Sequence, residues 1–92
     1  MNNEINRTFT VKKLDPVHVG ALIRIELNRQ HQTVSWLAQQ LSIQRPNCYR
    51  LLNASSLQTE TLFRVSQVLH HDFFVDYSVQ LKQVLTNNST AL

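Results

Sequence analysis

The scarcity of glycine and proline is the feature that most limits the folds open to this chain. Its 92 residues include one glycine and two prolines. Clusters of turn-forming residues, which separate the short strands of β-sandwiches and barrels, do not occur. Apolar residues recur at helical spacing instead, between short polar connections. We therefore predict an all-α fold with one hydrophobic core, as expected for a chain of this length.

The first two helices are predicted from capping residues and apolar spacing. Asp15 followed by Pro16 suits a helix start, and this helix should end near Gln30. Thr33 is the predicted N-cap of the second helix. The inward positions of the two helices are Val19, Ile23 and Leu27 in the first, and Val34, Leu37, Ala38 and Leu41 in the second.

Three more helices complete the prediction. Gln44 precedes a third helix, in which Pro46 is tolerated because it lies in the first turn. Thr59 and Asp72 are the predicted caps of the fourth and fifth helices. The inner face of the fourth helix consists of Leu62, Val65, Ser66 and Leu69.

The chain is predicted to contain one folded domain between two terminal segments. Residues 15–86 form this domain, and residues 87–92 form a C-terminal tail. Residues 1–14 form an arm or a brief strand, because Phe9 and Val11 alternate with polar residues. The apolar runs are too short for a membrane span, and the first residues lack an apolar signal segment. With one cysteine, Cys48, no internal disulfide is possible, and we expect a cytoplasmic protein.

The distribution of charge is more informative than the net charge of +3. No Asp or Glu occurs between Glu26 and Glu60, whereas Arg29, Arg45 and Arg50 lie in that interval. A segment without anionic side chains does not repel a polyanion. The interval is therefore a candidate for contact with a phosphate backbone.

The third helix should have two different faces. At about 100° per residue, its inner side carries Cys48, Leu51 and Leu52. The outer side is polar, basic and aromatic, with no carboxylate; it carries Arg45, Pro46, Tyr49, Arg50 and Asn53. Arginine can bond to O6 and N7 of guanine, asparagine can bond to adenine, and tyrosine can contact a phosphate or a thymine methyl. This face therefore suits a DNA major groove.

Residues 34–53, VSWLAQQLSIQRPNCYRLLN, carry a resemblance to a known family. Ala38 stands where two helices cross, Ile43 follows the turn, and Cys48 and Leu51 lie inside the second helix. This pattern resembles the helix-turn-helix of the Cro/phage-repressor-like (Xre-type) DNA-binding domains, and the later segment LFRVSQVL is similar to their fourth helix. The resemblance covers roughly residues 18–74. It implies a compact lambda-repressor-like bundle of about five helices.

The chain departs from the family pattern at three places. Ser42 occupies the turn position usually held by glycine, so the turn should be adjusted or strained. Leu52 and the Asn53–Ala54 pair replace a common Glu and Asn-Gly ending, which leaves Arg24 without its usual partner. Pro46 stands where many relatives carry a polar residue that contacts a base.

The resemblance also implies which residues contact DNA. The base-facing residues would be Gln44, Arg45, Asn47, Tyr49 and Arg50. The contacts to the DNA backbone would be made by Thr33, Ser35, Asn53, Ser55 and Ser56. Arg7, Lys12 and Lys13 would either form a basic arm or serve solubility.

Other chemistry finds little support in the sequence. His70, His71 and Asp72 are adjacent, so their side chains point in different directions, and no ligand spacing supports a metal site. A histidine at a helix terminus is the simpler interpretation. No set of catalytic residues can be placed. We expect no enzyme activity, no metal and no cofactor.

The predicted function is that of a sequence-specific DNA-binding transcriptional regulator, repressor-like and dimeric, whose partner is double-stranded DNA. A heptad-like seam of Phe74, Tyr77, Leu81 and Val84 either packs on the chain's own core or holds a homodimer. The alternative function is an antitoxin with a cognate toxin, or another protein-interaction module on the same scaffold.

Overall fold

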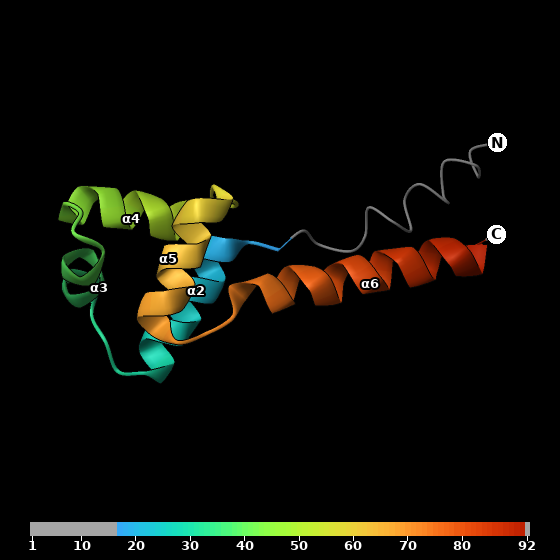
Figure 1. Cartoon of the computed structure of the whole chain (residues 1–92), viewed down its shortest axis with the longest axis horizontal. Helices are drawn as coiled ribbons and strands as arrows, with labels where there is room; N and C mark the ends of the chain where they lie inside the picture. Colours follow the sequence, from blue (N-terminus) through green and yellow to red (C-terminus); the bar gives the residue numbers. More distant parts are fainter. Residues whose placement is uncertain (1–16, 92) are drawn as a thin grey trace. The chain divides into compact units, whose positions relative to one another are not determined.

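A computed structural model describes residues 17–91, with side chains up to residue 87. This part of the chain is helical and has no strand, so the predicted all-α class is confirmed. It contains five helices, labelled in Figure 1: α2 (Val19–Arg29), α3 (Val34–Leu41), α4 (Arg45–Asn53), α5 (Thr59–Leu69) and α6 (Phe73–Ala91). The predicted arm, residues 1–14, lies outside the described residues.

The chain divides into two units. One is His18–Phe73; in the described part, the other contains Val17 and the helix from Phe74 onward. Helix α6 continues to Ala91, so residues 87–91 are helical and not a separate tail, in contrast to the prediction. The first unit ends at Phe73, whose side chain is buried, and the predicted domain limits, residues 15–86, stay a prediction.

Helix α2 begins later than predicted. His18, and not Asp15, is the N-cap: its Nδ1 accepts a hydrogen bond from the Ala21 N–H at 3.1 Å. Val17 and His18 are not helical, and Asp15 and Pro16 lie outside the described residues. The amide of Val19, the first residue of the helix, is also bonded: its N–H donates to the Ser55 carbonyl at 3.3 Å. A distant loop therefore fixes the start of this helix.

The segment from α3 to α4 follows the prediction closely. Thr33 caps α3, and its Oγ1 accepts from the Trp36 N–H at 3.0 Å. Ser42 ends α3 in the left-handed region, with φ 57° and ψ 43°, a conformation that glycine adopts at lower cost. Gln44 is the N-cap of α4, and Pro46 lies in the first turn. The strain expected at Ser42 is thus present in the backbone.

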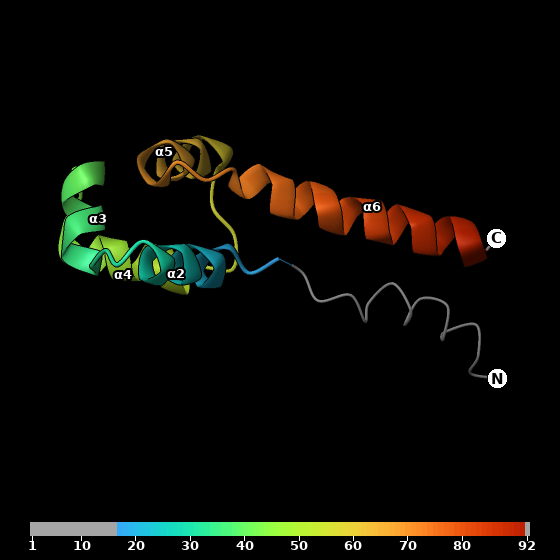
Figure 2. The same cartoon turned by 90° about the horizontal axis from the view of Figure 1, so that it is seen from below.

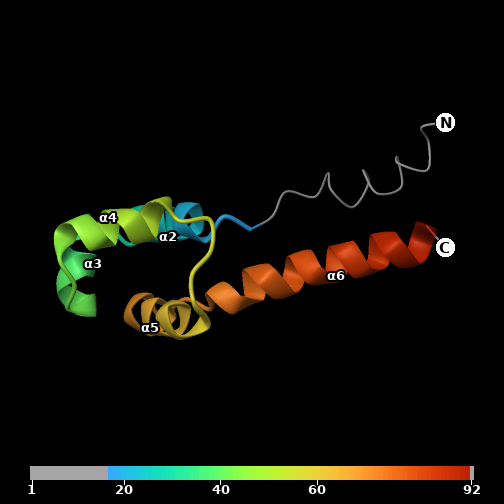
Figure 3. The same ribbon diagram turned by 90° about the horizontal axis from the view of Figure 1, so that it is seen from above.

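The core of the His18–Phe73 unit is formed by the predicted inner faces of four helices and by the first residue of α6. Its buried side chains are Val19, Ile23, Leu27, Leu37, Ala38, Leu41, Cys48, Leu51, Leu52, Leu62, Val65, Leu69 and Phe73. Figures 2 and 3 show α2 and α4 on one side of this unit, α5 on the other, and α3 across one end. The amphipathic spacing of the sequence therefore predicted most of this core. Val34 and Ser66, which were also predicted on inner faces, are only half-buried, and Phe73 was not predicted.

Gly20 permits a close approach of α2 to the end of α4. A Cβ atom at this position would lie 2.3 Å from the Leu52 carbonyl oxygen and 2.7 Å from that of Ala54. The Gly20 N–H also donates to the Ala54 carbonyl at 3.0 Å. Since both neighbours are backbone atoms, the contact requires glycine.

Helix α5 begins at Thr59, so Thr59 is the first helical residue and not the cap. The N-cap is Gln58, and its side chain makes no capping bond. The Arg64 guanidinium Nη2 donates to the Leu41 carbonyl at 2.7 Å, which satisfies the end of α3. A side chain from one helix therefore replaces solvent at the terminus of another.

Helix α6 differs from the other four helices in having no buried residue after Phe73, among the residues whose side chains are described. None of the residues 74–87 is buried. The exposed large apolar side chains of α6 are Phe74, Val75, Val79, Leu81 and Leu85. The Val17 N–H donates to Gln80 Oε1 at 3.0 Å. Among the described residues, no helix is long and apolar enough to cross a bilayer.

Candidate nucleic-acid interface

Helix α4 has the two faces that its sequence predicts. Cys48, Leu51 and Leu52 are buried against the rest of the His18–Phe73 unit. The predicted base-facing residues are all exposed; they are Gln44, Arg45, Asn47, Tyr49 and Arg50. The outer face therefore combines cationic, amide and phenolic groups, and none of its side chains is a carboxylate.

The N-terminal turn of α3 lies beside the middle of α4. Burial raises the pKa of the Cys48 thiol, which keeps it protonated, and its Sγ donates a weak hydrogen bond to the Val34 carbonyl at 3.8 Å. Val34 lies between Thr33 and Ser35, two predicted contacts to the DNA backbone, and both are exposed. This pair of hydroxyl groups is thus held close to the exposed face of α4.

The other predicted backbone contacts follow the C-terminal end of α4. Asn53, Ser55 and Ser56 are exposed. Their loop is anchored by the amides of Val19 and Gly20, which donate to the carbonyls of Ser55 and Ala54. The loop position is therefore set by the start of α2, and the predicted backbone contacts lie on both sides of the predicted base-facing set along the chain.

Arg24 is a candidate residue that the sequence prediction missed. Its Nη2 donates to Asn53 Oδ1 at 2.8 Å, and its Nε donates to the Leu52 carbonyl at 3.4 Å. The carboxylate that usually pairs with this arginine is absent, as expected from Leu52, but Arg24 is still bonded, because the neighbouring Asn53 amide and the Leu52 carbonyl accept its hydrogen bonds. Because Asn53 is neutral, the charge of Arg24 is not cancelled by it, and it adds a cation at the end of α4.

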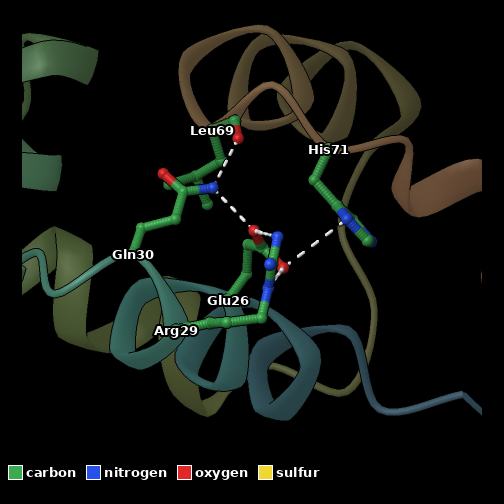
Figure 4. A network of polar contacts seen from close by, with 5 residues as sticks. All are labelled: Glu26, Arg29, Gln30, Leu69 and His71. Atoms are coloured by element: carbon green, nitrogen blue, oxygen red, sulfur yellow. Dashed lines mark hydrogen bonds and ion pairs between the residues drawn. The ribbon is translucent and has the colours of Figure 1, made fainter.

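Glu26 does not oppose this positive surface, because it points inward. Its carboxylate is 5% exposed and bonds to the Arg29 guanidinium. Gln30 Nε2 donates both to Glu26 Oε2 at 2.6 Å and to the Leu69 carbonyl at 2.7 Å, which connects α2 to the end of α5 (Figure 4). The hydrogen bond from Arg29, followed by that from Gln30, lowers the pKa of Glu26.

His70 and His71 lie at the end of α5, where one caps the helix and the other contacts Glu26 and Phe73. His70 is the C-cap of α5, with a left-handed backbone, which agrees with the prediction of a helix-terminus residue. His71 Nδ1 lies 3.5 Å from Glu26 Oε1 (Figure 4). The His71 ring lies 4.4 Å from the ring of Phe73. Within residues 17–91 no group of three or more His, Cys, Asp or Glu side chains is placed to hold a metal ion.

One internal hydrogen bond orients the outer face of α4. Arg50 Nη1 donates to Asn47 Oδ1 at 2.9 Å, one helical turn earlier. By contrast, the Arg45 side chain has no hydrogen bond or ion pair to any residue in the described part of the chain. The two predicted guanine-reading arginines therefore differ in how far their positions are fixed before any ligand binds.

No protein-family model, curated protein or solved structure matches this chain.

Proposed function

We propose that the His18–Phe73 unit binds double-stranded DNA in a sequence-specific manner and acts as a transcriptional regulator. The observation that carries this proposal is the outer face of α4. It exposes Arg45, Asn47, Tyr49 and Arg50 and has no carboxylate, while the inner face of the same helix is completely packed. An ordinary solvated helix face would mix both signs of charge.

The arrangement suits docking of α4 in the major groove. That groove admits one α-helix, and its base edges present acceptors to arginine and amide donors. The hydroxyl groups of Thr33 and Ser35 beside α4, and those of Ser55 and Ser56 after it, can bond to phosphates and fix the register. Arg24 contributes a further positive charge near the second pair.

Selection of bound sequences from a random duplex library tests the proposal directly. We expect one consensus, and we expect its affinity to fall steeply as salt rises, because phosphate contacts release counterions. Arg45→Ala and Arg50→Ala should each lower specific binding by about 1–3 kcal/mol and relax the preference at one base pair.

Lys82→Ala provides the control for charge alone, because it removes a cation from α6 and leaves α3 and α4 intact. It should keep the consensus. If the unmodified protein selects no consensus, or if both arginine variants bind every duplex as the parent does, the proposed function is wrong.

We further propose that a second copy of the chain pairs through α6. Of the seam predicted from the sequence, Tyr77 and Val84 are half-buried, whereas Phe74 and Leu81 are exposed and Leu85 adds to them. Together with Ser78, the three exposed residues have the 4-3-4 spacing of a helix–helix seam. Two copies would place two α4 helices in major grooves about 34 to 36 Å apart, on a palindromic site.

Sedimentation equilibrium at tens of micromolar tests this pairing. The full chain should have the mass of a dimer, and Leu81→Glu should have that of a monomer, because it puts a charge into the seam. Gln83→Glu, which adds the same charge at an exposed polar position of α6, is the matched control. A monomeric parent chain would exclude the homodimer and favour the alternative, an antitoxin whose exposed α6 binds a toxin.

A further inference from the structure

The hydrogen bond between Asn47 and Arg50 determines what each of the two side chains can still offer to a ligand. Asn47 Oδ1 accepts from Arg50 Nη1 at 2.9 Å, and both side chains are exposed on the outer face of α4. The amide oxygen is the single acceptor of the asparagine side chain. Bonded in this way, the pair directs N–H donors outward.

This arrangement restricts the role that the residue type alone predicts for Asn47. An asparagine that reads adenine must accept from N6 and donate to N7 at the same time. Arg50 takes one of the two lone pairs of Oδ1, and this bond fixes the amide plane. A contact with adenine would therefore have to share Oδ1 with Arg50, whereas positioning of Arg50 uses the bond that the structure already shows.

The same bond favours guanine recognition by Arg50. Guanine presents two acceptors, O6 and N7, and a guanidinium has five N–H donors, of which Asn47 takes one. The remaining donors are sufficient for a bidentate contact. Since a long flexible side chain loses rotamer entropy on binding, fixing it beforehand increases the affinity of the contact.

We propose that Asn47 is a positioning residue, and not an adenine reader, that holds Arg50 for recognition of a guanine in the major groove. This inference rests on the proposed function, since it concerns how the same face of α4 reads DNA. It also assigns the two arginines different selectivities: the base pair read by Arg50 should be more strongly restricted to guanine than the one read by Arg45.

The experiment is a comparison of selected consensus sequences from the random duplex library. Arg50→Ala identifies the base pair that Arg50 reads, because preference is lost there. In Asn47→Ala, the guanine preference at that same base pair should fall about tenfold, and the other positions should be unchanged. Asn47→Asp keeps an acceptor for Arg50, so it should retain the guanine preference although its added negative charge lowers the affinity for every duplex.

Asn28→Ala is the matched control, because Asn28 is an exposed asparagine on α2. Circular dichroism and the unfolding midpoint of each variant verify the fold. Two outcomes overturn the inference while the proposed function stands: Asn47→Ala loses an adenine preference and keeps the guanine, or it changes no position. If the parent protein selects no consensus, the proposed function fails, and this inference fails with it.

Discussion

The His18–Phe73 unit and the part of α6 beyond it differ in how far their apolar side chains are buried. In the first, apolar residues from every helix meet in one buried core, and Ile25 and Phe63 are the exposed large aliphatic and phenyl side chains of this unit. In the second, residues 74–87 include five large apolar side chains that are exposed. Burial of apolar surface is the main favourable term in folding, so the first region stabilises itself. The second region holds apolar surface that is available for association.

The comparison separates two kinds of variant. A change in the His18–Phe73 core should alter the free energy of unfolding. A similar change on α6 should leave that quantity nearly constant and alter association instead.

Gly20→Ala should reduce the free energy of unfolding by about 4 kcal/mol or more, because the added Cβ meets backbone atoms of Leu52 and Ala54. Helix propensity predicts the opposite sign, since alanine is favoured over glycine within a helix by about 1 kcal/mol. Urea unfolding followed by circular dichroism decides between the two. The reverse change one position later, Ala21→Gly, affects an exposed residue and should cost only about 1 kcal/mol. A Gly20→Ala protein as stable as the parent would show that α2 and α4 do not need this contact.

The same substitution made in both regions gives the next test. Leu37→Ala empties part of the core and should cost about 3 kcal/mol. Leu85→Ala, on a side chain that is 54% exposed, should change the free energy of unfolding by less than about 0.5 kcal/mol. Unfolding curves at several protein concentrations separate an effect on folding from one on association. Equal losses in the two variants would contradict the division into two units.

Glu26 connects stability to pH within the first unit. Its pKa in the folded protein lies below the ordinary value of 4.5, because the carboxylate accepts hydrogen bonds from Arg29 and Gln30. The stabilisation is therefore complete above about pH 4.5, the value expected in the unfolded chain, and is lost as pH falls through the lower folded pKa.

Glu26→Gln should thus cost about 1–3 kcal/mol at pH 7, and the difference from the parent should shrink toward pH 3. Urea unfolding across this pH range measures it. Glu60→Gln changes an exposed carboxylate in the first turn of α5 and is the control. A difference between Glu26→Gln and the parent that is constant from pH 7 to pH 3 would exclude a role for the ionised carboxylate.

The parts of the fold that depend on local sequence were predictable. The cap at Thr33, the position of Pro46 in the first turn of α4, and the inner face of that helix follow from spacing and capping over a few residues. The exposure of Arg45, Tyr49 and Arg50 follows from the same periodicity. The outline of the candidate interface therefore follows from the sequence alone.

The details that were missed depend on residues far apart in the chain. The start of α2 is fixed by carbonyls of the loop after α4, and Arg24 finds its acceptor at Asn53, 29 positions later. No local pattern encodes such pairs. Burial of Glu26 did have a local signal, because it lies three residues after Ile23 and seven after Val19, on the inner face of α2. A charged residue at such a position needs partners, and this would have indicated the polar network.

The single glycine of the chain lies within a helix, and three turns that glycine would suit are made without it. His31, Ser42 and His70, each at or just after a helix end, have φ angles of 58°, 57° and 52°. Left-handed backbone is unfavourable for residues with a Cβ by about 1–2 kcal/mol. These turns therefore represent an unused reserve of stability. Glycine at these helix ends, which lie outside the outer face of α4, would increase stability. The added stability would let the protein tolerate destabilising substitutions on that face.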